Sequence, residues 1–221
     1  MERLIDGPAD APASLLLAHG AGAPMDSPFM AAIATGLAER GWQVVRFEFP
    51  YMAQSRLSGQ RRAPDRLPKL LEAFRRQVAQ EKHRPLFIGG KSLGGRVASL
   101  LVDDLAESAG VCGCLCFGYP FHPPGKPEQL RTEHLTTLTT PTLILQGERD
   151  SFGQRAEVES YALSPAIEVQ WIPAGDHSFK PSRSSGHTEA GNWAAAVALA
   201  DRFGQQVLTQ SELASAPPCR S

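Results

Sequence analysis

Residues 89–95 contain a serine between two glycines, in the order Gly90, Ser92, Gly94. This G-x-S-x-G spacing is typical of a nucleophile elbow, a sharp turn that holds a serine on strained backbone between a strand and a helix. Apolar residues 85–88 predict the strand, and a helical pattern follows the motif. Glycine is needed on both sides, because a side chain there would collide with neighbouring backbone. We predict that Ser92 is a nucleophile; the alternative is a glycine-rich turn with an incidental serine.

A serine hydroxyl is a weak nucleophile at neutral pH unless a base takes its proton. Of the six histidines, His177 lies in a loop directly after the last predicted strand, at the same sheet edge as Ser92. We predict it as the base, with His187 as the alternative. Asp150 ends a strand that runs into a turn at this edge, and we predict that it orients the histidine. Glu148 in the same turn is the alternative acid.

Acyl transfer also needs backbone N–H groups aimed at the developing oxyanion, one from the residue after the nucleophile and one from the loop after the first strand. Leu93 is expected to supply the first. The second is expected from Ala21, with Gly22 as the alternative, since small residues in this loop permit close backbone approach. His19, which precedes them, is interpreted as a structural residue of the loop.

Four further side chains in loops after predicted strands are candidate substrate contacts: Tyr51, Arg61, Arg62 and Tyr119. The arginine pair could receive a carboxylate or phosphate of the substrate. The interpretation that we favour for the pair is a solvated or ion-paired surface site, because Asp65 dilutes its charge.

The elements that must position these residues alternate along the chain, strand after helix, which predicts an α/β fold with a mostly parallel sheet flanked by helices. Strands are predicted at residues 14–18, 43–49, 85–90, 111–117, 141–146 and 167–172. Helical periodicity spans residues 29–37, 67–78, 97–105, 154–162 and 189–203, with Gly204 as the predicted end of the last helix. Residues 50–64, 118–130 and 173–186 are predicted loops at the carboxyl ends of strands, where ligands bind in such sheets.

Cys112, Cys114 and Cys116 alternate within one predicted strand, so all three are expected on one face of the sheet. Their spacing is unfavourable for a disulfide or a shared zinc ion. We interpret them as buried small side chains.

The chain has 221 residues and a formal charge of −1. We expect a single domain over residues 1–208 and a disordered tail over residues 209–221. The balanced charge argues against nucleic acid or an acidic membrane surface as a partner. Without a recognisable signal peptide or apolar span, the expected location is the cytoplasm. No cofactor or metal is expected, and the chain is predicted to be a monomer or a homodimer.

The chain resembles the α/β-hydrolase superfamily, and within it the dienelactone-hydrolase-like bacterial branch related to the testis-expressed and non-specific-lethal-complex hydrolase-like proteins. Besides the elbow, the resemblance over residues 14–204 depends on LAHGAG (17–22), FEFPYM (47–52), GQRRAPD (59–65) and GDHSFK (175–180). It implies an α/β-hydrolase fold with a serine triad. Dienelactone hydrolase has a cysteine nucleophile where this chain has Ser92, so lactone specificity is not implied.

Only about 24 residues separate Phe117, at the end of one predicted strand, from the next predicted strand, which leaves no room for a lid or cap domain. An open crevice favours small, soluble acyl esters or thioesters as substrates. The alternatives are a non-catalytic scaffold that uses the fold for partner contacts, and a small peptidase of the same fold. All three triad residue types occur in the expected order, which favours the enzyme.

Overall fold

The computed structural model describes residues 2–82 and 85–215. Within them the chain forms one seven-stranded sheet in the order β1-β3-β2-β4-β5-β6-β7. Neighbouring strands are parallel except for β1, which pairs antiparallel with β3. The strands are β1 (Arg3–Asp6), β2 (Ser14–Ala18), β3 (Gln43–Phe47), β4 (Leu86–Lys91), β5 (Val111–Phe117), β6 (Thr142–Gly147) and β7 (Ile167–Ile172). The predicted mostly parallel sheet is confirmed.

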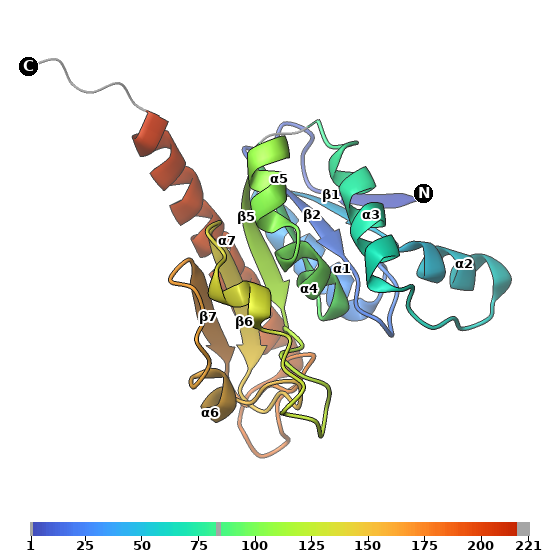
Figure 1. Ribbon diagram of the computed structural model, residues 1–221, viewed down its shortest axis with the longest axis vertical. Helices are drawn as coiled ribbons and strands as arrows, with labels where there is room; N and C mark the ends of the chain where they lie inside the picture. Colours follow the sequence, from blue (N-terminus) through green and yellow to red (C-terminus); the bar gives the residue numbers. More distant parts are fainter. Residues whose placement is uncertain (1, 83–84, 216–221) are drawn as a thin grey trace, which may run out of the picture.

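Helices cover both faces of this sheet (Figure 1). On one face lie α1 (Pro28–Ala38) and α7 (Glu189–Ser215), which pack against each other. On the other lie α3 (Leu67–Val78), α4 (Leu93–Ser99) and α5 (Val102–Ala109). The short helices α2 (Pro50–Ser58), α6 (Arg155–Val158) and the 3-10 helix η1 (Glu133–Thr136) lie in the connecting segments.

Each face of the sheet has its own apolar core. In β2, Leu16 packs into the core under α3 and α4, whereas Leu15 and Leu17 pack into the core under α1 and α7. Because both faces of the sheet are covered, the sequence of β2 is a continuous apolar run and does not alternate between apolar and polar residues. This double burial makes the central strands a rigid base for the loops at their carboxyl ends.

The predicted loop over residues 50–64 was wrong in its first part, because residues 50–58 form α2. Pro50 stands in the first turn, where a missing N–H costs nothing, and Gly59 ends the helix with a φ of 68°. Tyr51 is the one buried residue of α2, so no apolar stripe marked the helix in the sequence. In Figure 1, α2 projects beyond the edge of the sheet.

Gly204 was predicted to end the last helix, but α7 continues through it to Ser215. A Cβ at this position would lie 2.3 Å from ring carbons of Trp42, so glycine is required for helix packing rather than for a helix end. The part of the expected tail over residues 209–215 is therefore helical, and residues 216–221 lie outside the described residues.

Two further sequence interpretations differ from the structure. The periodic segment over residues 97–105 forms two helices, α4 and α5, separated at Leu100 and Leu101. Strand β1 was not predicted, since its sequence RLID lacks an apolar run, and it pairs only at the edge of the sheet.

The three alternating cysteines do not share one face, which corrects that expectation. Cys114 and Cys116 are buried in the core under α4, with their Sγ atoms 3.8 Å apart, whereas Cys112 packs against the opposite core. The register of β4 and β5 jumps from Leu86↔Val111 to Phe87↔Gly113, so Cys112 is an extra residue in a β-bulge. A bulge of this kind interrupts the period of two and redirects the side chain.

Between β5 and β6 the chain forms η1 as its one helical element, and no separate cap domain is present in this fully described segment. The carboxyl ends of β4, β6 and β7 are therefore uncovered by any inserted domain.

No helix in the described ranges is both long and apolar enough for a bilayer crossing.

Candidate active site

Ser92 lies in the turn between β4 and α4 with φ 51° and ψ −112°, a conformation that is costly for a residue with a side chain. The glycines of the motif permit this turn. A Cβ on Gly90 would lie 2.5 Å from the carbonyl carbon of Gly94, and a Cβ on Gly94 would lie 2.5 Å from the Ala18 carbonyl oxygen. The backbone contacts thus match the elbow geometry expected from the sequence.

Ser92, His177 and Asp150 lie in one hydrogen-bonded row. The Ser92 Oγ is 2.8 Å from His177 Nε2, and His177 Nδ1 is 2.8 Å from Asp150 Oδ2. The three residues follow β4, β7 and β6, whose carboxyl ends meet at one edge of the sheet. His187, the alternative base, is exposed in the segment before α7. The predicted residues are therefore brought together in the geometry of a Ser-His-Asp triad.

The carboxylate of Asp150 is completely buried, and each of its oxygens accepts a further hydrogen bond. Gln146 Nε2 donates to Oδ2 at 2.8 Å, and the Phe152 amide donates to Oδ1 at 2.9 Å. Glu148, the alternative acid, accepts a bond from the Ala174 amide instead. Gln146 was missed in the sequence, because a glutamine at a strand end carries no motif that distinguishes it.

The surroundings of His177 favour the uncharged form of its imidazole. Burial lowers its pKa, the Asp150 hydrogen bond opposes that effect, and the positive charge of Lys91 lowers the pKa further. The ring of Phe152 stacks on the imidazole with a centroid distance of 4.1 Å. A neutral imidazole can accept the proton of Ser92, which is what a general base must do.

Lys91, the residue before Ser92, reaches the loop that carries His177. Its Nζ donates to the His177 carbonyl oxygen at 2.5 Å and lies 5.4 Å from the ring centroid of Phe29. Burial lowers the pKa of Lys91 to about 8. Lys91 therefore holds the backbone of the residue that is predicted to be the base.

The same loop is fixed from two other directions. Asp176 accepts hydrogen bonds from the Ser178 and Lys180 amides, and Asn192 of α7 donates to the Phe179 carbonyl oxygen at 2.8 Å. Asp176 thus supports the loop without contacting the imidazole through a hydrogen bond. The position of His177 depends on α7 as well as on β7.

Leu93, the first residue of α4, and Ala21, in the loop after β2, are the predicted oxyanion donors. Within the described chain neither amide donates to a protein acceptor. Ala21 and Gly22 line cavity space together with Ser92. Tyr51 Oη donates to the Ala21 carbonyl oxygen at 3.2 Å, which orients this loop. The arrangement leaves two amides free to bind a developing oxyanion.

His19 behaves as expected for a structural residue. Its ring is buried, and its Nε2 accepts a hydrogen bond from the Phe49 amide at 3.1 Å. The Nδ1 must then carry the proton, which it donates to the Gly20 carbonyl oxygen at 2.6 Å. Burial lowers the pKa of this histidine and favours the neutral ring.

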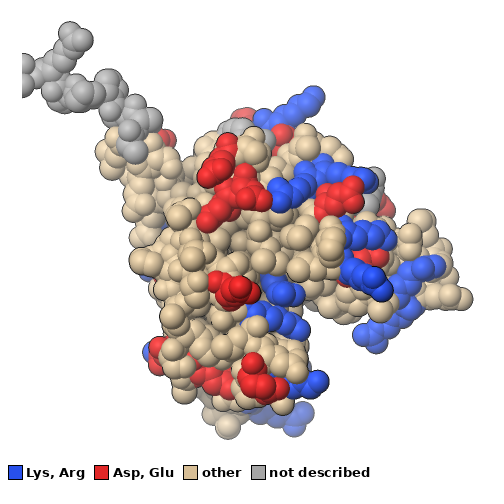
Figure 2. Space-filling view, in the orientation of Figure 1, with Lys and Arg blue, Asp and Glu red and all other residues tan. Residues whose placement is uncertain are grey.

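Two cavities flank Ser92. One, of about 290 Å³, extends along Phe29, Met30 and the His177 loop. The other, of about 340 Å³, extends between α3, α4 and the segment after β5, and includes Arg96 and Arg131. In Figure 2 the surface is hollowed between the side that bears α2 and the side that bears α6.

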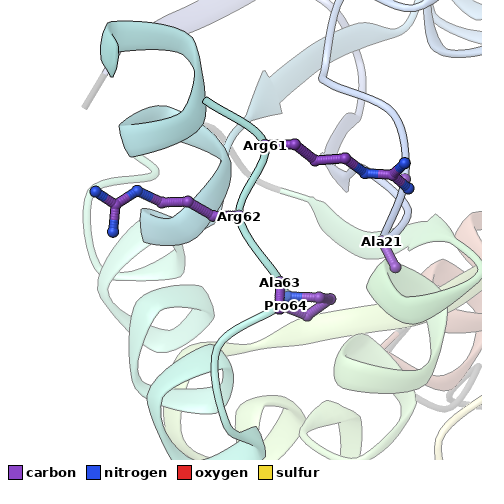
Figure 3. A pocket seen from close by; sticks show the side chains of 6 residues that line it. Ala21, Arg61, Arg62, Ala63 and Pro64 are labelled. Atoms are coloured by element: carbon purple, nitrogen blue, oxygen red, sulfur yellow. The ribbon is translucent and has the colours of Figure 1, made fainter. Parts of the chain in front are cut away.

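The four candidate substrate contacts are not among the residues that line the two cavities at Ser92. Arg61 and Arg62 line a neighbouring hollow of about 430 Å³ that does not include Ser92, and in Figure 3 the Arg62 side chain points away from it. Tyr119 is buried, and its Oη donates to the Arg131 carbonyl oxygen at 2.9 Å. Tyr51 is also buried and contacts the oxyanion loop. Their roles in substrate binding stay predictions.

In residues 2–82 and 85–215, no group of three or more His, Cys, Asp or Glu side chains is placed to hold a metal ion. The titratable groups at Ser92 instead form the hydrogen-bonded row described above.

Comparison with known proteins agrees with this architecture. The chain is similar to a dienelactone hydrolase from Anabaena variabilis (20% identity, 92% of this chain and 90% of that chain, TM-score 0.69). It is also similar to Est1E from Butyrivibrio proteoclasticus (14% identity, 94% of each chain, TM-score 0.65) and to XC6422 from Xanthomonas campestris, described as an a/b serine hydrolase without lid (18% identity, 89% of this chain and 88% of that chain, TM-score 0.62). At these identities the solved structures show a shared fold. Residues 11–205 match the family described as "Alpha/beta hydrolase domain", and the chain therefore belongs to the alpha/beta hydrolase family.

Proposed function

We propose that the protein is a serine hydrolase that cleaves small, soluble acyl esters or thioesters through an acyl-enzyme. The observation that carries this proposal is the pair of 2.8 Å contacts that join Ser92 Oγ to His177 Nε2 and His177 Nδ1 to Asp150 Oδ2. A scaffold has no need for this row of atoms, nor for a strained serine beside two free amides.

In the proposed reaction, Ser92 Oγ attacks the carbonyl carbon of the ester while His177 Nε2 takes its proton. The carbonyl electron pair moves onto oxygen, where the amides of Leu93 and Ala21 bind it. When the tetrahedral intermediate collapses, the alkoxide or thiolate leaves with the proton from His177. Water then attacks the acyl-enzyme by the same steps and releases a carboxylic acid.

The size of the proposed substrate follows from the open crevice. No cap covers Ser92, and the two cavities at the serine measure about 290 and 340 Å³. Such spaces suit short acyl and alcohol groups, whereas a long lipid chain would find little apolar wall to bury it. Efficient hydrolysis of long-chain but not short-chain esters would contradict this part of the proposal.

Two finer assignments belong to the same proposal. One is the branch related to the testis-expressed and non-specific-lethal-complex hydrolase-like proteins, which depends on the four sequence segments given above. The other is a cytoplasmic location, which is supported by the free thiols of Cys114 and Cys116, the usual state in a reducing compartment.

The proposal is tested by reaction with a fluorophosphonate followed by intact mass measurement. Wild-type protein should gain one label, and Ser92→Ala and His177→Ala should gain none, because each removes a group needed for an activated serine. On 4-nitrophenyl acetate both variants should lose roughly 10⁴-fold or more in kcat.

Ser178→Ala is the matched control, since Ser178 is an exposed neighbour of His177 and should keep its label. Circular dichroism of each variant shows whether it is folded. A well-folded wild-type protein that takes no label would overturn the hydrolase proposal in favour of a scaffold.

A further inference from the structure

Two arginines line the larger cavity beside Ser92. Arg96 lies on α4, one turn after the serine, and its amide donates to the Ser92 carbonyl oxygen at 3.0 Å. Arg131 comes from the segment between β5 and β6. Much of the remaining wall is apolar, with Leu67, Leu70, Pro120 and Phe152. Two positive charges therefore lie in an otherwise largely apolar space at the nucleophile.

Within the described residues, neither guanidinium has a carboxylate within ion-pair distance, whereas Arg46 and Arg56 are paired with acidic side chains. The Arg96 Nε is buried and has no hydrogen-bond partner. An unpaired buried donor on a charged group is unfavourable, so the protein by itself leaves the Arg96 guanidinium incompletely compensated.

The two guanidinium groups also act on each other. Burial lowers the pKa of Arg131, and the positive charge of Arg96 lowers it further. Burial together with the charge of Arg96 lowers the pKa of the nearby His134 to about 4, which leaves that histidine neutral. The local potential is therefore positive, and an anion in the cavity would relieve this repulsion.

Asp65 is the one acidic residue in the wall of this cavity. Its Oδ1 accepts a hydrogen bond from Lys69 at 2.7 Å, and its Oδ2 accepts one from the Tyr51 amide at 3.0 Å. Both oxygens are thus engaged by residues at the start of α3 and α2 rather than by the arginines. Asp65 therefore does not neutralise the pair.

The backbone beneath both arginines is well supported. Arg96 stands on a helix, and Arg131 is held by its amide on the Phe121 carbonyl oxygen at 2.8 Å and by its own carbonyl oxygen on Tyr119 Oη at 2.9 Å. Guanidinium forks suit a planar carboxylate better than a lysine would, because they offer paired N–H donors.

We propose that Arg96 and Arg131 form an anion subsite that binds a carboxylate on the substrate, so the preferred substrates are esters or thioesters that carry a free carboxylate near the scissile bond. This inference builds on the proposed serine hydrolase function. The uncharged half of the substrate then occupies the cavity along Phe29 and Met30.

The test compares kcat/KM for three esters. They are 4-nitrophenyl butyrate, mono-4-nitrophenyl glutarate with a carboxylate on the acyl group, and 3-carboxy-4-nitrophenyl butyrate with a carboxylate on the leaving group. Wild-type protein should prefer one carboxylate ester over the neutral ester by about tenfold or more, as expected for charge-assisted hydrogen bonds. The preferred ester identifies which half of the substrate carries the anion.

Arg96→Met and Arg131→Met should each reduce kcat/KM for the preferred carboxylate ester by about ten- to hundredfold, and leave the neutral ester within about threefold. Arg76→Gln is the matched control, because Arg76 is an exposed arginine of α3 that pairs with Glu72. Arg76→Gln should leave kcat/KM unchanged for both the carboxylate ester and the neutral ester.

A measurement on the wild-type protein tests the subsite even if the arginine variants fail to fold. Glutarate should inhibit hydrolysis of the neutral ester competitively, and pentanol at the same concentration should not. Equal rates for all three esters without glutarate inhibition, or equal losses on neutral and charged esters in both variants, would overturn the subsite. Because fluorophosphonate labelling reports Ser92 independently, failure of the subsite is distinguishable from failure of the hydrolase proposal.

Discussion

At the scale of single residues, the surroundings of His177 favour the neutral imidazole, and its Nε2 lies within hydrogen-bond distance of Ser92 Oγ. Desolvation and the Lys91 charge disfavour the imidazolium, while the buried carboxylate of Asp150 stabilises it. The balance places the pKa of His177 below its ordinary value. In the proposed mechanism, an imidazole that is already neutral at physiological pH is available to take the Ser92 proton.

The first prediction concerns the pH dependence of this base. The neutral imidazole is the active form, so kcat/KM for 4-nitrophenyl acetate should rise with pH and reach half its plateau below pH 6.5, the ordinary pKa of histidine. In Lys91→Met the lost positive charge no longer disfavours the imidazolium. The pKa of His177 should rise, and the acidic limb should move to higher pH.

Lys82→Met is the control for this shift, because Lys82 is exposed and precedes β4 at the opposite edge of the sheet. It changes the net charge equally and should leave the profile in place. A Lys91→Met profile that coincides with that of the wild type would show that the lysine charge does not act on the base.

At the scale of elements, the elbow depends on close backbone contact between α4 and β2. A Cβ on Gly94 would lie 2.5 Å from the Ala18 carbonyl oxygen and 2.7 Å from that of His19. These atoms belong to the strand end that leads into the oxyanion loop. The glycine therefore sets the distance between the nucleophile turn and the loop that carries Ala21.

We expect Gly94→Ala to lower the free energy of unfolding by about 1–3 kcal/mol, the usual range for overpacking a tight contact. Urea denaturation followed by fluorescence measures this change. Gly22→Ala serves as the stability control, because nothing lies within 4 Å of a Cβ at that position. Equal midpoints for the two variants would be inconsistent with the tight approach.

At the scale of the whole molecule, α7 joins the active-site loops to the core on the far face of the sheet. Asn192 near its start holds the His177 loop, and Asp201 accepts a hydrogen bond from Trp42 Nε1 at 2.9 Å. Gly204 lies against the ring of Trp42, and Gly36 of α1 lies against Val197. Two glycines thus let α7 approach its neighbours closely.

Gly204→Ala should lower the free energy of unfolding by about 1–3 kcal/mol, because its Cβ would overlap rigid ring carbons of Trp42 that have little room to move. Thermal or urea unfolding measures the loss, and near-ultraviolet circular dichroism reports the Trp42 environment. Gln205→Ala, at the next and exposed position of α7, should be close to neutral. If Gly204→Ala instead raised the free energy of unfolding, as the higher helix propensity of alanine alone would do, the packing role would be contradicted.

The residues of the hydrogen-bonded row were predictable, since each has a local sequence signature. Ser92 stands in a glycine motif after an apolar strand, and Asp150 and His177 stand in turns after strands whose carboxyl ends must share one edge of a parallel sheet. The same local patterning predicted six of the strands with ends within two residues.

The tertiary structure alone decided which distant residues meet. Phe152 on the ring of His177, and Arg96 beside Arg131, have no shared motif, because their contacts arise where separate segments of the chain pack together. Cys112 faces the opposite side of the sheet from Cys114 because of a β-bulge in the pairing of β5 with β4. Gly204 does not end a helix but allows α7 to pack closely against the ring of Trp42. Local sequence specifies periodicity and turns, whereas the partner of a buried side chain depends on segments that only the folded chain brings within contact distance.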